Sequence, residues 1–201
     1  MEKKIAQSRI ASITRTTRET DISLTLNLDG SGQAQIDTKI GFFDHMLHGF
    51  ARHGLFDLTV KVKGDLEVDT HHTIEDTGIV LGNAIRQAVG DKEGIARYGS
   101  RILPMDEALI LCALDLCNRP YLVYDLQLNR EKVGDLETEM VREFFYAVSY
   151  GAAMNLHIKQ IEGSNNHHII EGAFKAFAKA LDEATRRDER ISGVLSTKGS
   201  L

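Results

Sequence analysis

Two copies of one short motif carry most of the chemistry that this sequence offers. The first reads His71-His72-Thr73-Ile74-Glu75, and the second, 96 residues later, reads His167-His168-Ile169-Ile170-Glu171. Turn-forming residues precede each copy, and such side chains accept the free N–H groups at a helix N-terminus. We therefore expect both motifs on the first turns of helices. There each glutamate lies three and four residues from its histidines, on the same face of the helix.

Paired imidazoles beside a carboxylate are typical metal ligands. Adjacent positions on a helix point about 100° apart, so one helix can offer its two histidines to two different metal ions. A single His-His pair is usually a surface feature, but here the pair is repeated. Five of the eight histidines, including His45, fall in or near the copies. Nitrogen and oxygen ligands without sulfur favour Mn, Fe, Co, Ni or Zn.

The composition is that of an ordinary globular protein. The 201 residues, 42% of them hydrophobic, suffice for one long domain or two small fused ones. A net charge of −5 argues against a surface for nucleic acid or anionic membranes. Neither a signal sequence nor an apolar stretch of about 18 residues is found, so we expect a cytoplasmic protein. In that compartment Cys112 and Cys117 are expected to be reduced core thiols.

Hydrophobic periodicity predicts the elements that position the motifs. A turn at Asp29-Gly30 separates two early strands from a short return strand. The predicted strands are residues 8–15, 20–28, 33–38, 58–62, 107–116, 121–128 and 156–161. The predicted helices are residues 42–53, 71–89, 136–154 and 165–187.

The two halves also align with each other. At a spacing of 98 residues, residues 57–61 lie over residues 155–159, and His45 lies over Glu143. A two-residue deletion then gives the spacing of 96 at the histidine pairs. The sequence therefore predicts an α+β fold of two duplicated half-domains, residues 1–95 and 96–201, each a sheet covered by two helices.

The segments around these histidines resemble the signatures of the imidazoleglycerol-phosphate dehydratase family, which acts in histidine biosynthesis. The segments are Asp44-His45-Met46-Leu47, residues 69–76 and residues 166–171, and the likeness extends from about Arg9 to Gly199. The resemblance implies a fold similar to domain 2 of ribosomal protein S5 and trimers assembled into a 24-subunit shell. It also implies two Mn²⁺ ions in each active site, with sites shared between subunits.

The resemblance assigns roles to individual residues. Position 143 is a histidine in many relatives and a glutamate here, and either can bind a metal. The implied metal ligands are His45, His71, His72, Glu75, Glu143, His167, His168 and Glu171. The implied substrate-binding residues are Glu19, His45, His53, His71, Glu75, Arg97, Arg119, His167, Lys175, Thr197 and Lys198, and the implied catalytic acids or bases are Glu171 and Glu19.

A phosphorylated substrate requires cations at one end of its pocket. Taken alone, the candidate cations would be solvated surface charges, but the resemblance makes them phosphate ligands, together with a C-terminal phosphate-binding tail. These cations are Arg97, Arg119, Lys175 and Lys198. Lys175 lies four residues after Glu171 on the same helical face, so a ligand on that metal can reach its ammonium group.

The implied reaction is loss of water from imidazole glycerol phosphate, which gives imidazole acetol phosphate. The C–H bond that breaks has no neighbouring carbonyl to acidify it. Metals on both ring nitrogens would hold the ring as an imidazolate, whose electrons can expel the hydroxyl and leave a diazafulvene. Glu171 or Glu19 then accepts the acidified proton.

Two other classes of function stay open at this stage. A di-metal phosphatase would use the ions to activate water and would release inorganic phosphate. A metal-storage or structural shell would have no turnover, but it leaves the four cations Arg97, Arg119, Lys175 and Lys198 unexplained.

Overall fold

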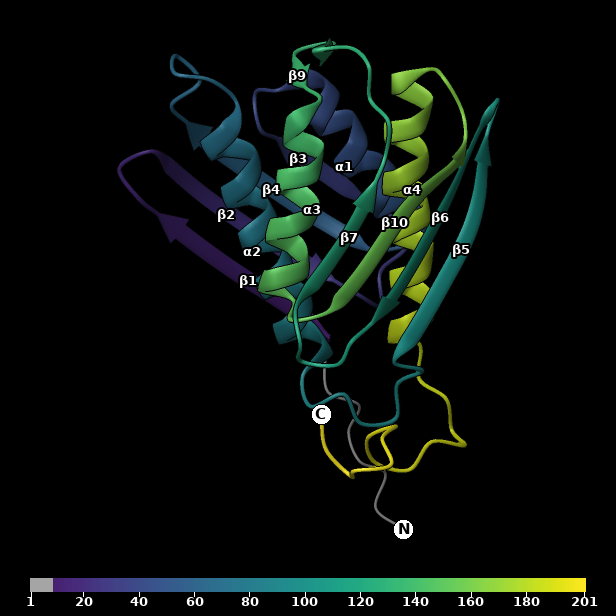
Figure 1. Cartoon of the computed structure of the whole chain (residues 1–201). Helices are drawn as coiled ribbons and strands as arrows, with labels where there is room; N and C mark the ends of the chain where they lie inside the picture. The colour runs from purple at the N-terminus through teal and green to yellow at the C-terminus, as the bar shows by residue number, and fades with distance from the viewer. Residues whose placement is uncertain (1–8) are drawn as a thin grey trace.

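Two four-stranded sheets enclose four helices in the computed structural model, which describes residues 9–201 (Figure 1). The first sheet has the strand order β1-β2-β4-β3 and the second has the order β5-β6-β10-β7. The first half contains β1 (Ile10–Thr16), β2 (Thr20–Asn27), β3 (Ala34–Asp37), α1 (Gly41–Gly54), β4 (Asp57–Gly64) and α2 (His71–Val89). The second half contains β5 (Tyr98–Met105), β6 (Ala108–Asp115), β7 (Tyr121–Asp125), β8 (Lys132–Val133), β9 (Leu136–Glu137), α3 (Glu139–Gly151), β10 (Asn155–Glu162) and α4 (Asn166–Thr185).

The helices form the inner layers of the molecule. α1 and α2 cover the first sheet, α3 and α4 cover the second, and the helices pack against each other as the pairs α1–α4 and α2–α3. Strand residues alternate between this core and the outer face, as in β2. Stacked and edge-on phenylalanines fill the centre, among them Phe50, Phe144, Phe145, Phe174 and Phe177.

The repeat predicted from the sequence is visible in the structure. Both sheets have the same strand order when their strands are taken in chain order. β4 and β10, which begin at Asp57 and Asn155, occupy equivalent third positions and keep the predicted spacing of 98 residues. The predicted α+β fold, with two sheets each covered by helices, is confirmed.

Two of the predicted elements need correction. The segment after the turn does not pair back onto β2, because β4 occupies that position, and β3 instead runs parallel to β4. The predicted helix over residues 136–154 is shorter, since residues 136–137 form β9 and Ala153 has a positive φ of 51°. Ser8, the first residue of the first predicted strand, lies outside the described residues.

Strand β5 is a strand of the second sheet that periodicity missed, as it also missed the two-residue strands β8 and β9. Its outer face is exposed and contains Arg101, and Pro104 lies near its end, so it lacks an apolar alternation. The strand packs on α4 through Gly99, where a Cβ atom would lie 1.9 Å from the Ala180 carbonyl oxygen. Close backbone approach and pairing with β6, rather than apolar side chains, therefore define this strand.

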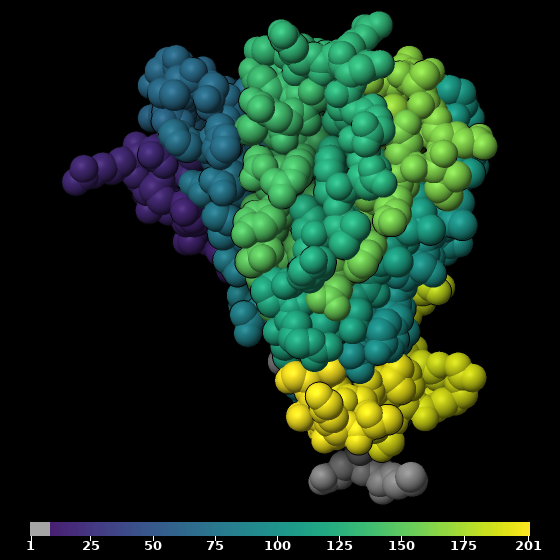
Figure 2. Space-filling model, in the orientation of Figure 1, coloured from purple at the N-terminus to yellow at the C-terminus, as the bar shows by residue number. Residues whose placement is uncertain are grey.

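All four helices point the same way. Their N-termini lie at the end of the molecule that also holds the β8–β9 hairpin. Residues 186–201, which follow α4 and are called the C-terminal tail here, cross the opposite end (Figures 1 and 2). Both histidine motifs therefore lie at one end and the tail at the other. Within residues 9–201, no helix is both long and apolar enough to span a bilayer.

Candidate metal and substrate site

A side-chain oxygen two residues before the first histidine of each motif accepts the backbone N–H of that histidine. The Asp69 carboxylate accepts the backbone N–H of His71 at 2.8 Å, and the Asn165 side-chain oxygen accepts that of His167 at 2.9 Å. Asn165 is the N-cap of α4, whereas the N-cap of α2 is Thr70, whose own side chain makes no cap hydrogen bond. Both motifs therefore lie on the first turns of helices, as predicted, and these bonds orient the turns that carry the imidazoles.

The two imidazole pairs also have the same geometry. The ring centroids of His71 and His72 are 6.0 Å apart with an interplanar angle of 76°, and those of His167 and His168 are 6.0 Å apart at 77°. Each pair therefore diverges from its helix in two directions. The two imidazoles of one pair are therefore not directed at a common point.

The second motif meets α1 to form a compact ligand group. The ligand atoms of His45, His167 and Glu171 all lie within 4.8 Å of one another, the one group of this kind among residues 9–201. The Nε2 atom of His167 is 3.1 Å from a Glu171 carboxylate oxygen, and the Nε2 atom of His45 is 3.8 Å from the same oxygen. Two imidazole nitrogens and one carboxylate suit a first-row divalent metal.

Cations continue this group along the interface between α1 and α4. The Lys175 ammonium lies 2.8 Å from the second Glu171 oxygen. Burial alone would raise the pKa of Glu171, but Lys175, His45 and His167 outweigh it and lower that pKa below its ordinary value. The pKa of His53 is lowered, first by burial and then by the positive charges of Lys175 and Lys179. His53 is therefore neutral near pH 7.

The first motif has its own carboxylates. The Nε2 atom of His71 is 3.6 Å from a Glu75 oxygen, as the helical spacing predicts. The Nδ1 atom of His72 is 3.0 Å from an Asp65 oxygen, and its Nε2 atom is 3.8 Å from Glu19. The hydrogen bond to Asp65 is the main reason that the pKa of His72 is raised.

His168 has a similar environment. Its Nδ1 atom is 2.7 Å from a Glu107 oxygen, and its Nε2 atom is 3.5 Å from an Asp106 oxygen. The Glu107 carboxylate also accepts the backbone N–H of Asn165 at 2.8 Å. The bond to His168, followed by that N–H, lowers the pKa of Glu107 to about 2. The same bond to Glu107 raises the pKa of His168.

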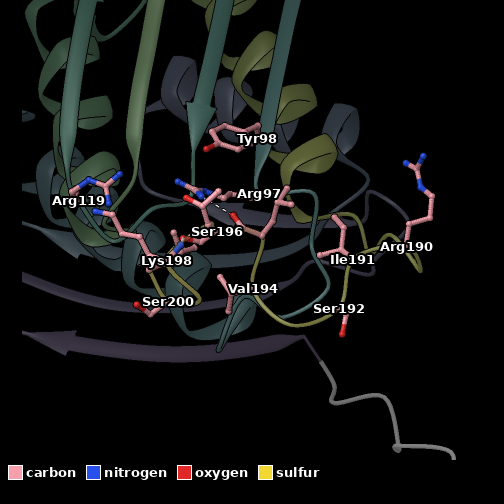
Figure 3. Close-up of a pocket in the computed structure, with 13 residues that line it drawn as sticks. Arg97, Tyr98, Arg119, Arg190, Ile191, Ser192, Val194, Ser196, Lys198 and Ser200 are labelled. Atoms are coloured by element: carbon pink, nitrogen blue, oxygen red, sulfur yellow. Dashed lines mark hydrogen bonds between the residues drawn. The ribbon is translucent and has the colours of Figure 1, made fainter.

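Three of the four predicted phosphate ligands, Arg97, Arg119 and Lys198, line a cavity of about 750 Å³ at the tail end of the molecule (Figure 3), whereas the fourth, Lys175, lies beside Glu171. Arg97 is buried there, because its guanidinium binds Asp115 and donates to the Leu195 carbonyl oxygen at 2.7 Å. Arg119 and Lys198 also line the cavity, and neither has a carboxylate partner in the described part of the chain. Arg97 therefore fixes the tail, whereas Arg119 and Lys198 have charge available for an anion. Thr197 lines the same cavity.

The structure does not bring every predicted residue into one place. Glu143 on α3 pairs with its neighbour Arg142 at 2.8 Å, and no hydrogen bond or ion pair joins it to a histidine within residues 9–201. The motif end and the tail cavity are separated by the length of α4. At 1.5 Å per residue, the 20 residues of this helix span about 30 Å.

Two residues of the β8–β9 hairpin, Asp135 and Glu137, contact the segments where α1 and α2 begin, and the sequence did not predict these contacts. The Asp135 carboxylate accepts the backbone N–H groups of Gly41 and Phe42 at 2.6 and 2.9 Å, and so caps α1 from the other half of the chain. Glu137 accepts the hydroxyl of Thr70, directly before the first motif. No local sequence signal marks such partners, because 93 and 94 residues separate the Asp135 contacts.

Comparison with known proteins gives one consistent result. The family model described as imidazoleglycerol-phosphate dehydratase matches residues 38–181. The chain is 67% identical to the protein of that name from Lachnoclostridium phytofermentans over 96% of this chain and 99% of the relative. It is 64% identical to that from Acetivibrio thermocellus over 94% and 97%.

Solved structures agree with the sequence comparison. The crystal structure of imidazoleglycerol-phosphate dehydratase from Staphylococcus aureus superimposes with a TM-score of 0.81 and 38% identity, covering 89% of this chain and 99% of that one. The enzyme from Pyrococcus furiosus, solved in complex with (S)-C348, superimposes with a TM-score of 0.82 and 38% identity, covering 94% and 100%.

Proposed function

Because the chain belongs to the imidazoleglycerol-phosphate dehydratase family, we propose how its residues divide the work of that enzyme. The enzyme is a hydro-lyase of histidine biosynthesis, and its substrate is imidazole glycerol phosphate. In our proposal the histidine motifs hold two Mn²⁺ ions against the imidazole ring. The tail cavity holds the phosphate.

One observation carries the proposal: His45, His167 and Glu171 converge within 4.8 Å at the end of the molecule where both motifs lie. His45 is on a different helix from the other two, so this convergence is a property of the fold rather than of one helical face. The donor set fits a divalent metal, and the half-exposed imidazoles leave room for a substrate nitrogen. The other assigned ligands are His71, His72, Glu75, His168 and Glu143.

The metals would stabilise the substrate ring without its N–H proton, which makes the ring able to expel the neighbouring hydroxyl. The chain then has to supply a proton acceptor. Glu171 already binds Lys175 and His167, whereas the Glu19 side chain is 53% exposed and, among the described residues, forms an ion pair with His72 alone. We therefore assign proton transfer to Glu19 and the holding of the metal to Glu171.

The phosphate needs a separate part of the protein. Arg119 and Lys198 line the tail cavity without a carboxylate partner among residues 9–201, and Arg97 holds the tail in place through Leu195. A glycerol unit is far shorter than the roughly 30 Å of α4. One substrate therefore cannot contact the motif end and the tail end of the same chain. This separation supports sites shared between subunits, and with them a 24-subunit shell.

Metal titration tests this division of work. Protein stripped of metal is expected to be inactive, and activity should rise until two Mn²⁺ ions are bound per chain. Full activity in verified metal-free protein would contradict the proposal. Product analysis in the same assay excludes the phosphatase, because only that reaction would release inorganic phosphate.

A further inference from the structure

The second histidine of each motif is held by a carboxylate that no motif contains. Asp65 contacts the Nδ1 atom of His72 at 3.0 and 3.2 Å with its two oxygens. Glu107 contacts the Nδ1 atom of His168 at 2.7 Å. In both cases the Nε2 atom is left on the open side of the ring, at 3.8 Å from Glu19 and 3.5 Å from Asp106.

The two carboxylates come from unrelated places in the chain. Asp65 follows β4, seven residues before His72, whereas Glu107 stands in the turn between β5 and β6, 61 residues before His168. The internal repeat therefore does not explain their common role, because equivalent positions would keep one spacing. Carboxylates from two different parts of the fold therefore make the same contact with an imidazole Nδ1 atom.

The contact determines which nitrogen can bind a metal. An ionised carboxylate only accepts hydrogen bonds, so Nδ1 must carry the proton. In the neutral ring the lone pair then lies on Nε2, and the ring plane is held by the same bond. Histidines that bind metals almost always donate their other N–H group in this way.

We propose that Asp65 and Glu107 are positioning residues, which hold His72 and His168 as Nε2-directed metal ligands. The inference rests on the proposed metal function of the motifs. Neither carboxylate touches the metal itself in this arrangement. Each acts through the imidazole beside it.

Asp65 permits the cleaner test, because within residues 9–201 its side chain hydrogen-bonds to His72 alone. We expect Asp65→Ala to weaken Mn²⁺ binding at one class of site about 10- to 100-fold. Asp65→Asn should recover much of this loss, since its amide oxygen can still accept the Nδ1–H bond. Glu67→Ala is the matched control, an exposed carboxylate of the same loop, and should bind Mn²⁺ as the unaltered chain does.

Binding is read by electron paramagnetic resonance of free Mn²⁺ during titration of the full chain, and circular dichroism verifies that each variant is folded. Glu107→Ala should affect the other class of site in the same way, with Glu107→Gln as its conservative partner. In the metal-free protein, ¹⁵N NMR should place the His72 proton on Nδ1, and Asp65→Ala should remove that preference.

The outcomes separate this inference from the proposed function. Unchanged Mn²⁺ binding in folded Asp65→Ala, beside normal binding by the unaltered chain, would overturn the positioning role alone. A neutral His72 ring that carries its proton on Nε2 rather than Nδ1, at a pH above its raised pKa in the unaltered metal-free protein, would do the same. Failure of the unaltered chain to bind Mn²⁺ at all would instead overturn the function on which the inference rests.

Discussion

The histidine side chains at the motif end are positioned to bind ligands rather than to pack in the hydrophobic core. The side chains of His72 and His168 are 33% and 26% exposed, and both contact carboxylates. The phenylalanine cluster between the sheets contains neither of them. Their chemistry can therefore be removed without removing the packing that holds the fold.

His72→Ala and His168→Ala should each reduce kcat/KM by more than about 100-fold, because metal stabilisation of charge contributes several kcal/mol to such reactions. The free energy of unfolding should change by less than about 0.5 kcal/mol, as for other surface positions. Steady-state kinetics and urea denaturation measure the two effects. His157→Ala, at an exposed position of β10, is the matched control and should leave both unchanged.

Among single residues, the sequence alone predicted the histidines and glutamates of the motifs as ligands. It did not predict the carboxylates that contact these motifs. His71, His72, His167, His168 and their glutamates are found by spacing, because one helix turn brings them together. His45 required the comparison of the two halves. Asp65 and Asp135 are not found at all, since loops and a distant hairpin bring their carboxylates to the motifs.

Among the elements, the helix pair α2–α3 depends on close backbone contact. A Cβ atom at Gly82 would lie 2.6 Å from the Val148 carbonyl oxygen and 2.9 Å from the Ala152 nitrogen. Gly82→Ala should therefore destabilise the fold by about 1–3 kcal/mol, because backbone must move. Gly49→Ala in α1 has nothing within 4 Å and should be neutral or stabilising by up to about 1 kcal/mol. Equal denaturation midpoints for the two variants, at one metal concentration, would contradict this account.

The β8–β9 hairpin connects the two halves at the N-terminus of α1. Asp135→Ala should reduce stability by about 1 kcal/mol, the usual value of a lost helix cap. Since α1 carries His45, the same variant should also bind Mn²⁺ more weakly. Asp135→Asn is expected to recover only part of this loss, because its single amide oxygen can accept one of the two N–H groups that the two carboxylate oxygens of Asp135 accept. If the alanine variant kept full stability and metal affinity, the hairpin would have no positioning role.

Elements with a regular apolar pattern could be predicted from the sequence. Elements that depend on contacts with other strands or helices could not. β2, β4 and the helices of both motifs follow period two or 3.6. β5 depends on the approach of α4 to Gly99, and the parallel pairing of β3 depends on β4 taking the place beside β2. Tertiary contacts decide whether β5 forms and where β3 pairs, and the periodicity of a single sequence does not report such contacts.

The whole molecule places its two sets of functional groups at opposite ends (Figures 1 and 2). If sites are shared, His168→Ala and Arg119→Ala damage different subunits of one site. Each variant alone should be nearly inactive, whereas shells co-assembled from both should recover about a quarter of the unaltered activity through random mixing. The recovered activity is measured on shells that are purified after co-expression of the two variants. Mixed shells without activity would show that each site lies within one chain.

In the proposed mechanism the motif end binds the substrate ring through both of its nitrogens. A substrate methylated on one ring nitrogen tests it most directly, because the methyl group blocks that nitrogen and the ring can no longer become an anion. We predict that this compound competes with imidazole glycerol phosphate through its phosphate but is not dehydrated, when product formation is followed by mass spectrometry. Dehydration of the methylated compound at a rate near that of the normal substrate would contradict the account.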